Sequence, residues 1–255
     1  MNYTTYDIHY FQSGEIEVSL NAVNNIIYCK LYKDLNQSIM AALIAIAKLR
    51  KFHSEITLIM PFLPSSRSDL QPIITILESL GVSKLITVEI HSEAPQSAIE
   101  IYNITIIPDV IKEIGIDHNK LVITAPDKGG CKRGKNAAQA LKCNFISMEK
   151  TRHNRLIRHT LNNPEVVKNR QILIVDDIID SGGTINSAAE VLINSGAKSV
   201  KVLGIHGILS KREFSPLIDK IYITNTIKQD HSINQLEIVD VDNIISSKVE
   251  EIINL

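Results

Sequence analysis

Residues 172–184 constrain the fold of this chain more than any other stretch, and they read Ile-Leu-Ile-Val-Asp-Asp-Ile-Ile-Asp-Ser-Gly-Gly-Thr. The four apolar residues from Ile172 to Val175 predict a strand that is buried on both faces. The two glycines let a ligand approach the backbone closely, and the apolar spacing after Thr184 predicts a helix. A strand, a small-residue turn and a helix N-terminus together predict an anion site, because free N–H groups and the helix dipole face the ligand.

Two acids, Asp176 and Asp177, directly follow the predicted strand. Acids beside a phosphate cradle repel a bare phosphate, so they favour sugar hydroxyls or a metal ion, and a sugar phosphate satisfies both halves of the site. The motif resembles the loop that binds ribose 5-phosphate or phosphoribosyl pyrophosphate (PRPP) in phosphoribosyltransferases and ribose-phosphate pyrophosphokinases. A plain surface turn is one alternative. The Asp-Asp-x-x-Asp metal motif of prenyl-diphosphate enzymes is another, but it requires a helix, which the β-branched run and the Gly-Gly pair disfavour.

Strand-like and helix-like segments alternate along nearly the whole chain. The predicted strands are Glu15–Leu20, Asn25–Cys29, Ile56–Met60, Leu85–Glu89, Leu121–Thr124, Asn144–Met148, Ile172–Val175, Ser199–Gly204 and Lys220–Thr224. The predicted helices are 36–52, 69–80, 107–114, 132–141, 184–195 and 241–254. This alternation predicts an α/β fold whose mostly parallel sheets are flanked by helices. Ligands of such sheets bind beyond the carboxyl ends of the strands.

Two strand–helix series are separated near Tyr102–Pro108. We therefore predict two domains, residues 1–107 and 108–255, with the last helix able to pack back across the boundary. At 255 residues the chain is long enough for two modest domains.

The overall composition is that of an ordinary globular protein, with 44% apolar and 22% charged residues. The net charge of −1 gives no reason to expect a nucleic-acid or membrane partner. Three widely spaced cysteines, no signal peptide and no membrane-length apolar run favour a reducing cytoplasm.

Other candidate residues follow predicted strands, and each has an ordinary interpretation when taken alone. Asp127 lies in a Pro-Asp-Lys-Gly-Gly turn, where it could orient a hydroxyl or hold a hard cation. His91 could equally be a hydrogen-bonded core residue. Arg67, in a Pro- and Ser-rich loop, could contact a polyphosphate or only solvent. Lys150 and Arg152 open a basic stretch that is either a solvated face or a mobile loop closing over a nucleotide.

Taken together, these segments resemble the ribose-phosphate pyrophosphokinase (PRPP synthetase) family across nearly the whole chain, although this chain is shorter and divergent. The segments that carry the resemblance are Phe11-Gln-Ser-Gly-Glu15, Pro61–Asp69, Glu-Ile-His91, Pro-Asp127-x-Gly-Gly, Lys150-x-Arg152, 172–184 and His206–Ser210. A plain phosphoribosyltransferase would share only the 172–184 loop. The resemblance implies two phosphoribosyltransferase-like domains, with the ATP and magnesium side in the first and the ribose-5-phosphate loop in the second.

The resemblance also implies an activity: transfer of the diphosphoryl group of ATP to the 1-hydroxyl of ribose 5-phosphate, giving PRPP and AMP. Lys150, Arg152 and His91 would be catalytic, and His91 and Asp127 would help hold Mg²⁺. The residues implied to bind ribose 5-phosphate are Asp176, Asp177, Asp180, Ser181, Gly182, Gly183 and Thr184. The residues implied to bind ATP are Phe11, Ser13, Glu15, Arg67 and Ser68. The Phe11–Glu15 segment would complete a neighbouring subunit's adenine pocket, which implies a homo-oligomer that is at least a dimer.

The departures from the family pattern lie in the nucleotide half of the chain. Ser68 stands where glutamine is usual, Leu70 and Gln71 replace a basic pair, and Ser13 replaces an acid or amide. Two alternatives to PRPP synthesis therefore stay open. One is the same transfer to a larger 5-substituted ribose such as ADP-ribose, and the other is a catalytically silent regulatory relative. A PRPP-consuming transferase is disfavoured because no base-binding hood is visible near the termini.

Overall fold

The computed structural model describes residues 2–32, 34–153, 156–211, 213–229 and 233–254. The chain divides into two compact units. Unit 1 contains the residues up to Thr105, a short segment that begins at Thr226, and the segment from Asp242 onward. Unit 2 begins at Ile106 and contains the rest of the chain.

Unit 2 is built on a seven-stranded sheet in the order β10-β9-β8-β11-β12-β13-β15. Its strands are β8 (Leu121–Ala125), β9 (Asn144–His153), β10 (Leu156–Leu161), β11 (Gln171–Ile179), β12 (Ser199–Gly207), β13 (Lys220–Thr224) and β15 (Leu236–Val239). All neighbouring strands are parallel except the β9–β10 hairpin, which is antiparallel. The carboxyl ends of the parallel strands therefore share one edge, where the strand–helix loops lie.

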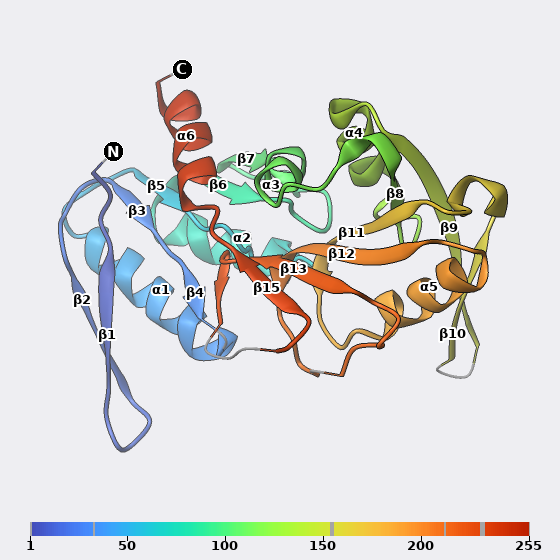
Figure 1. Ribbon diagram of the computed structural model, residues 1–255. Coiled ribbons are helices and arrows are strands. Elements are labelled where there is room, and N and C mark those ends of the chain that lie inside the picture. The colour runs from blue at the N-terminus through green and yellow to red at the C-terminus, as the bar shows by residue number, and fades with distance from the viewer. Residues whose placement is uncertain (1, 33, 154–155, 212, 230–232, 255) are drawn as a thin grey trace. The chain divides into compact units, whose positions relative to one another are not determined.

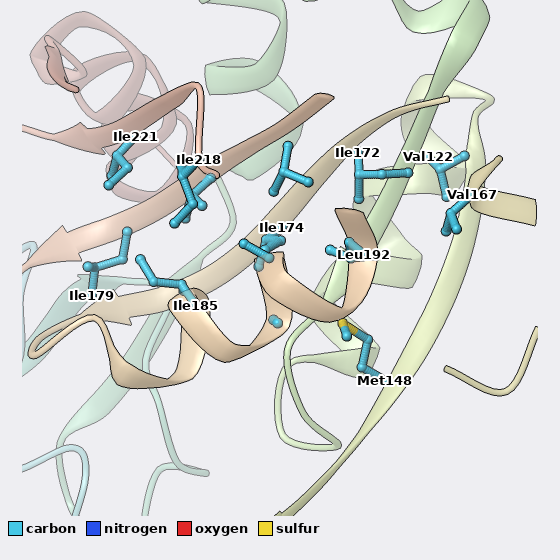
Figure 2. Packing of buried hydrophobic residues seen from close by; sticks show 14 of the residues in the cluster. Val122, Met148, Val167, Ile172, Ile174, Ile179, Ile185, Leu192, Ile218 and Ile221 are labelled. Carbon is cyan, nitrogen blue, oxygen red and sulfur yellow. The ribbon is translucent and has the colours of Figure 1, made fainter. Parts of the chain in front are cut away.

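Helices cover both faces of this sheet: α3 (Ile107–Glu113), α4 (Cys131–Leu141) and α5 (Gly183–Asn194). Figure 1 shows α4 and α5 on opposite sides of the sheet. Figure 2 shows the core beneath α5, in which Leu192 of the helix faces Ile172 and Ile174 of β11. Leu173 and Val175 are also completely buried and point to the other face, because side chains alternate along a strand. The central strand is thus buried on both sides, as predicted.

Unit 1 contains a four-stranded parallel sheet in the order β3-β5-β6-β7. Its strands are β3 (Ile26–Tyr28), β5 (Ile56–Ile59), β6 (Val82–Val88) and β7 (Glu100–Ile104). The helices of this unit are α1 (Leu35–Leu49), α2 (Gln71–Ser79) and α6 (Asp242–Ile253). The hairpin of β1 (Tyr6–Tyr10) with β2 (Ile16–Leu20) and the short pair β4 (Leu31–Tyr32) with β14 (Ile227–Lys228) complete it.

The α/β architecture with parallel, helix-flanked sheets is the one predicted, and all six predicted helices are present. Helix α6 belongs to unit 1, so the second unit does not run continuously from 108 to 255. The Lys30 ammonium donates to Asp242 at 2.7 Å, which anchors the start of α6 within unit 1. Short or polar strands, including β1, β4, β7, β10, β14 and β15, were missed because they carry weak apolar patterns.

Several strands are longer than predicted, and the extensions of β9 and β11 concern the site. β11 continues through Asp176 and Asp177 to Ile179, because it keeps pairing with β12 after β8 has ended. β9 continues to His153, because it pairs with β10 in a hairpin. The two acids and Lys150 therefore lie on strands, where the sequence predicted strand ends and a loop.

Candidate active site

The loop after β11 forms the start of helix α5, as the glycine-rich motif predicted. Gly182 caps the helix with a left-handed backbone, φ +79°. A Cβ atom added there would lie 3.0 Å from the Phe214 ring, so glycine is required both by the turn and by the neighbouring side chain. The Asn186 amide ties the Phe214 segment to α5, accepting from Ser215 N–H at 2.9 Å and donating to the Glu213 carbonyl at 3.3 Å. The Phe214 segment is thus tied to the start of α5 by two hydrogen bonds.

Lys150 connects three segments of unit 2 at this edge of the sheet. Its Nζ atom donates to Asp127 Oδ2 at 3.1 Å and to Thr184 Oγ1 at 3.0 Å. The strands that carry these segments are sheet neighbours, in the order β9-β8-β11. The Lys150 side chain is 15% exposed, so its charge is only partly screened by water. The arrangement places one cation beside the phosphate-type loop and beside a carboxylate.

Asp127 organises the neighbouring loop between β8 and α4. Its Oδ1 atom accepts the backbone N–H groups of Gly129 at 3.0 Å and Gly130 at 3.3 Å. Its other oxygen accepts from Lys150. The carboxylate is therefore fixed at the edge of the sheet, with one oxygen used by the turn and the other directed to the site.

In the acidic pair on β11, Asp177 is buried and Asp176 is half-buried, and the pair has a cationic partner that the sequence analysis did not single out. Arg133 Nη2 lies 3.2 Å from Asp177 Oδ2, and Asp177 N–H donates to Asp176 Oδ1 at 3.0 Å. Burial, and then the adjacent charge of Asp177, raises the pKa of Asp176 well above its ordinary range, while Arg133 opposes that shift. Arg133 was visible in the sequence only as one of several cations on a predicted helix.

A second residue that sequence reasoning passed over is His159 on β10. It is 5% exposed, and its Nδ1 atom lies 3.0 Å from the Ser187 hydroxyl on α5. Burial is the main cause that lowers the pKa of this imidazole, and Lys150 acts in the same direction. The sequence signal that would have placed it on the inner face is its spacing of two residues from the apolar Ile157 and Leu161.

The remaining predicted site residues of unit 2 lie in the turn before α5 and on β9. Asp180 is half-buried and Ser181 is exposed, both in the turn before α5. Arg152 lies on β9 opposite Ile157, but its side chain falls outside the described part of the structure. Among the described residues, no group of three or more His, Cys, Asp or Glu side chains is arranged to hold a metal ion.

In unit 1, the loops that follow β5 and β6 lie together, because these strands are neighbours in the sheet. The Ser92 hydroxyl donates to the Ser66 carbonyl, which joins the loop of Arg67 and Ser68 to the loop of His91. His91 follows the end of β6 by three residues, after a buried Glu89 whose φ is +41°. The structure thus brings the predicted polyphosphate arginine and the predicted metal histidine into neighbouring loops.

The predicted adenine-binding residues occupy the turn of the β1–β2 hairpin. Phe11 N–H donates to the Glu15 carbonyl at 3.0 Å, and the Ser13 hydroxyl donates to Glu15 Oε2 at 2.9 Å. The Phe11 side chain is 47% exposed. The hairpin therefore presents an aromatic ring to its surroundings.

The fold and these loops define a phosphoribosyl transferase domain, whose family model matches residues 94–240. The chain is 31% identical to the ribose-phosphate pyrophosphokinase of Mycoplasma genitalium, over 86% of this chain and 73% of that protein. Identity to the enzyme of that name from Aquifex aeolicus is 28%, over 95% and 86% respectively. The crystal structure of phosphoribosylpyrophosphate synthetase from Mycobacterium smegmatis has the same fold, with a TM-score of 0.81 at 23% identity, covering 98% of this chain and 91% of that one. The chain belongs to the ribose-phosphate pyrophosphokinase family.

The part of the chain that the structure describes contains no helix with both the length and the apolar character needed to cross a membrane.

Proposed function

We propose that this protein transfers the diphosphoryl group of ATP to the 1-hydroxyl of ribose 5-phosphate, giving PRPP and AMP. The single observation that carries the proposal is the position of Lys150, whose Nζ atom lies 3.0 Å from the Thr184 hydroxyl and 3.1 Å from Asp127. A cation there faces both the sugar-phosphate loop and a carboxylate suited to a nucleotide-bound metal. Family membership supports the same reaction.

In the proposed reaction the α5 N-terminus holds the acceptor. Backbone N–H groups of the Asp180–Thr184 turn and the helix dipole bind the 5-phosphate. Asp176 and Asp177 accept hydrogen bonds from the ribose hydroxyls, and the Arg133–Asp177 ion pair keeps the second carboxylate in position. The acceptor is then oriented before chemistry begins, which lowers the entropic part of the barrier.

The chemical step exchanges one oxygen for another on the β-phosphorus of ATP. The ribose 1-oxygen attacks that phosphorus, its hydroxyl proton is released, and the bond to the bridging oxygen of the α-phosphate breaks to give AMP. We propose that Lys150 and Arg152 stabilise the negative charge on the transferring group. Arg67 and Ser68 would bind the ATP phosphates, and Phe11, Ser13 and Glu15 the adenine of ATP on a neighbouring subunit.

We propose Mg²⁺ as the cofactor, with Asp127 and His91 as its protein ligands. The Asp127 carboxylate fits this role, because Mg²⁺ prefers oxygen ligands, binds few carboxylates and completes its shell with water and substrate phosphates. It therefore does not require the larger acidic cluster that is absent from the described residues. When bound, it would neutralise charge on the ATP phosphates. The homo-oligomer and the cytoplasmic location stay predictions.

The test is ³¹P NMR of the purified protein with Mg-ATP and ribose 5-phosphate, with ADP-ribose as a parallel acceptor. We expect AMP and a new anomeric diphosphate with ribose 5-phosphate. A product only with ADP-ribose would reassign the acceptor. AMP with neither acceptor, from folded protein that still binds ATP, would contradict the proposal and favour a regulatory relative.

A further inference from the structure

The hairpin of β9 and β10 contacts helix α5 through two side chains that lie opposite each other. Lys150 and His159 are directly paired across the antiparallel ladder, so their side chains project from the same face of the hairpin. Lys150 contacts the Thr184 hydroxyl, and His159 contacts the Ser187 hydroxyl, each at 3.0 Å. Thr184 and Ser187 are three residues apart and therefore lie on one face of the helix.

Further along the hairpin, the side chains on the face that carries Lys150 and His159 enter the hydrophobic core. The next inward pair along the ladder is Leu161 opposite Met148, and Met148 is completely buried. Both side chains pack in the cluster beneath α5, and Figure 1 shows β10 beside that helix. His159 therefore lies on this inward face of the hairpin, next to the core residues and opposite Lys150 of the site.

A buried imidazole at this position has a cost that an aliphatic side chain would avoid. Removing a polar group from water is unfavourable unless hydrogen bonds replace the lost contacts. An aliphatic residue would bury the same face of β10 without that requirement. The hydrogen bond between His159 Nδ1 and Ser187 offsets part of the cost, whereas Nε2 is buried without a hydrogen-bond partner among the described residues. Unlike an apolar contact, the bond to Ser187 fixes the register of the hairpin on the helix.

We propose that His159 and Ser187 form a positioning pair that docks the β9–β10 hairpin on α5 and so holds the Lys150 ammonium beside Thr184. His159 acts through Lys150 and does not touch the substrate. The effect that we expect this pair to have on turnover rests on the proposed function. The docking itself does not depend on the reaction.

The first experiment measures kcat and KM of the full chain with Mg-ATP and ribose 5-phosphate. We expect His159→Ala and Ser187→Ala each to lower kcat by about 10- to 100-fold, because small displacements of a catalytic group are costly. The KM for ribose 5-phosphate should change by less than about twofold, since the α5 turn is intact. Ser187→Thr, which keeps the hydroxyl, and His159→Asn, which keeps a polar atom near the Nδ1 position, should restore most of the rate. Thr160→Ala, on the exposed face of the same strand, is the control.

The second experiment repeats both alanine substitutions in a Lys150→Ala background. If the pair acts only through Lys150, neither substitution lowers kcat further, because the energies of coupled residues are not additive. Equal fold-losses in the two backgrounds would overturn the proposal and leave His159 as a core residue. The combined His159→Ala and Ser187→Ala variant should lose no more than the larger single loss.

Hydrogen exchange provides a readout that does not need turnover. We expect either alanine substitution to speed exchange of the amides at 148–151 and 158–161 while those of β12 stay protected. Unchanged exchange in the hairpin would overturn the proposal. Wild-type protein that makes no AMP would instead contradict the proposed function, and the exchange result would still decide whether the pair docks the hairpin. Ser187→Ala serves if His159→Ala does not fold.

Discussion

Arg133 of α4 and Asp177 of β11 form a buried ion pair behind the sugar-phosphate loop, with their side chains 12% and 2% exposed and an N–O distance of 3.2 Å. Removing the arginine would leave a buried carboxylate with its main counter-charge gone. We expect Arg133→Met to lower the free energy of unfolding by about 3–5 kcal/mol, as measured by urea denaturation. The double variant Arg133→Met with Asp177→Asn should recover most of that loss. A single variant as stable as the wild type would show that the pair contributes little.

Lys150 should matter for turnover far more than for binding, because its charge is proposed to meet the transferring group. We expect Lys150→Ala to lower kcat by about 10²- to 10³-fold, with ribose 5-phosphate affinity, measured by calorimetry, within about twofold. Lys168→Ala, at an exposed pair with Glu165, is the matched control. Turnover that survives in Lys150→Ala would remove the lysine from the chemical step.

Alanine substitutions at Gly182 and Gly115 can separate the cost of backbone strain from the role of the turn in binding the acceptor. Both have positive φ, +79° and +64°, but an added Cβ atom meets the Phe214 ring only at Gly182. We expect Gly182→Ala and Gly115→Ala each to cost about 1–2 kcal/mol of stability from the backbone alone. Only Gly182→Ala should also raise the KM for ribose 5-phosphate. Equal KM values for the two variants would mean that the turn does not bind the acceptor.

We expect the contribution of Asp176 to the stability of the fold to decrease as the pH rises. Its raised pKa in the folded state means that the folded protein holds a proton that the unfolded chain has already released. The resulting stability is complete below the ordinary pKa of an aspartate and is lost as pH rises through the folded pKa. We expect Asp176→Asn to raise the melting temperature, more at pH 8 than at pH 5, while weakening sugar-phosphate binding. The exposed Asp117→Asn serves as the control. A stabilisation independent of pH would contradict the assigned cause.

Much of the fold followed from local patterns in the sequence. Ile172–Val175 is apolar without interruption, which predicted a strand covered on both faces, and β11 is the centre of the unit 2 sheet. The Gly-Gly turn before the helix predicted the α5 N-terminus because few other residues accept the backbone that Gly182 adopts. These features are local, and local chemistry is what a sequence displays most directly.

The tertiary structure alone decided how these parts meet. Lys150 lies 23 residues from Asp127 and 34 from Thr184, and only the strand order β9-β8-β11 brings them together. The pairing of Arg133 with Asp177 and of His159 with Ser187 likewise joins residues 44 and 28 positions apart. The basic stretch that opens at Lys150 and Arg152 looked like either a solvated face or a mobile loop, because strands with alternating polar residues and little apolar content resemble loops until a partner strand pairs with them. Which side chains share a site therefore depended on long-range strand pairing, whereas the chemistry of each loop was already determined by its own residues.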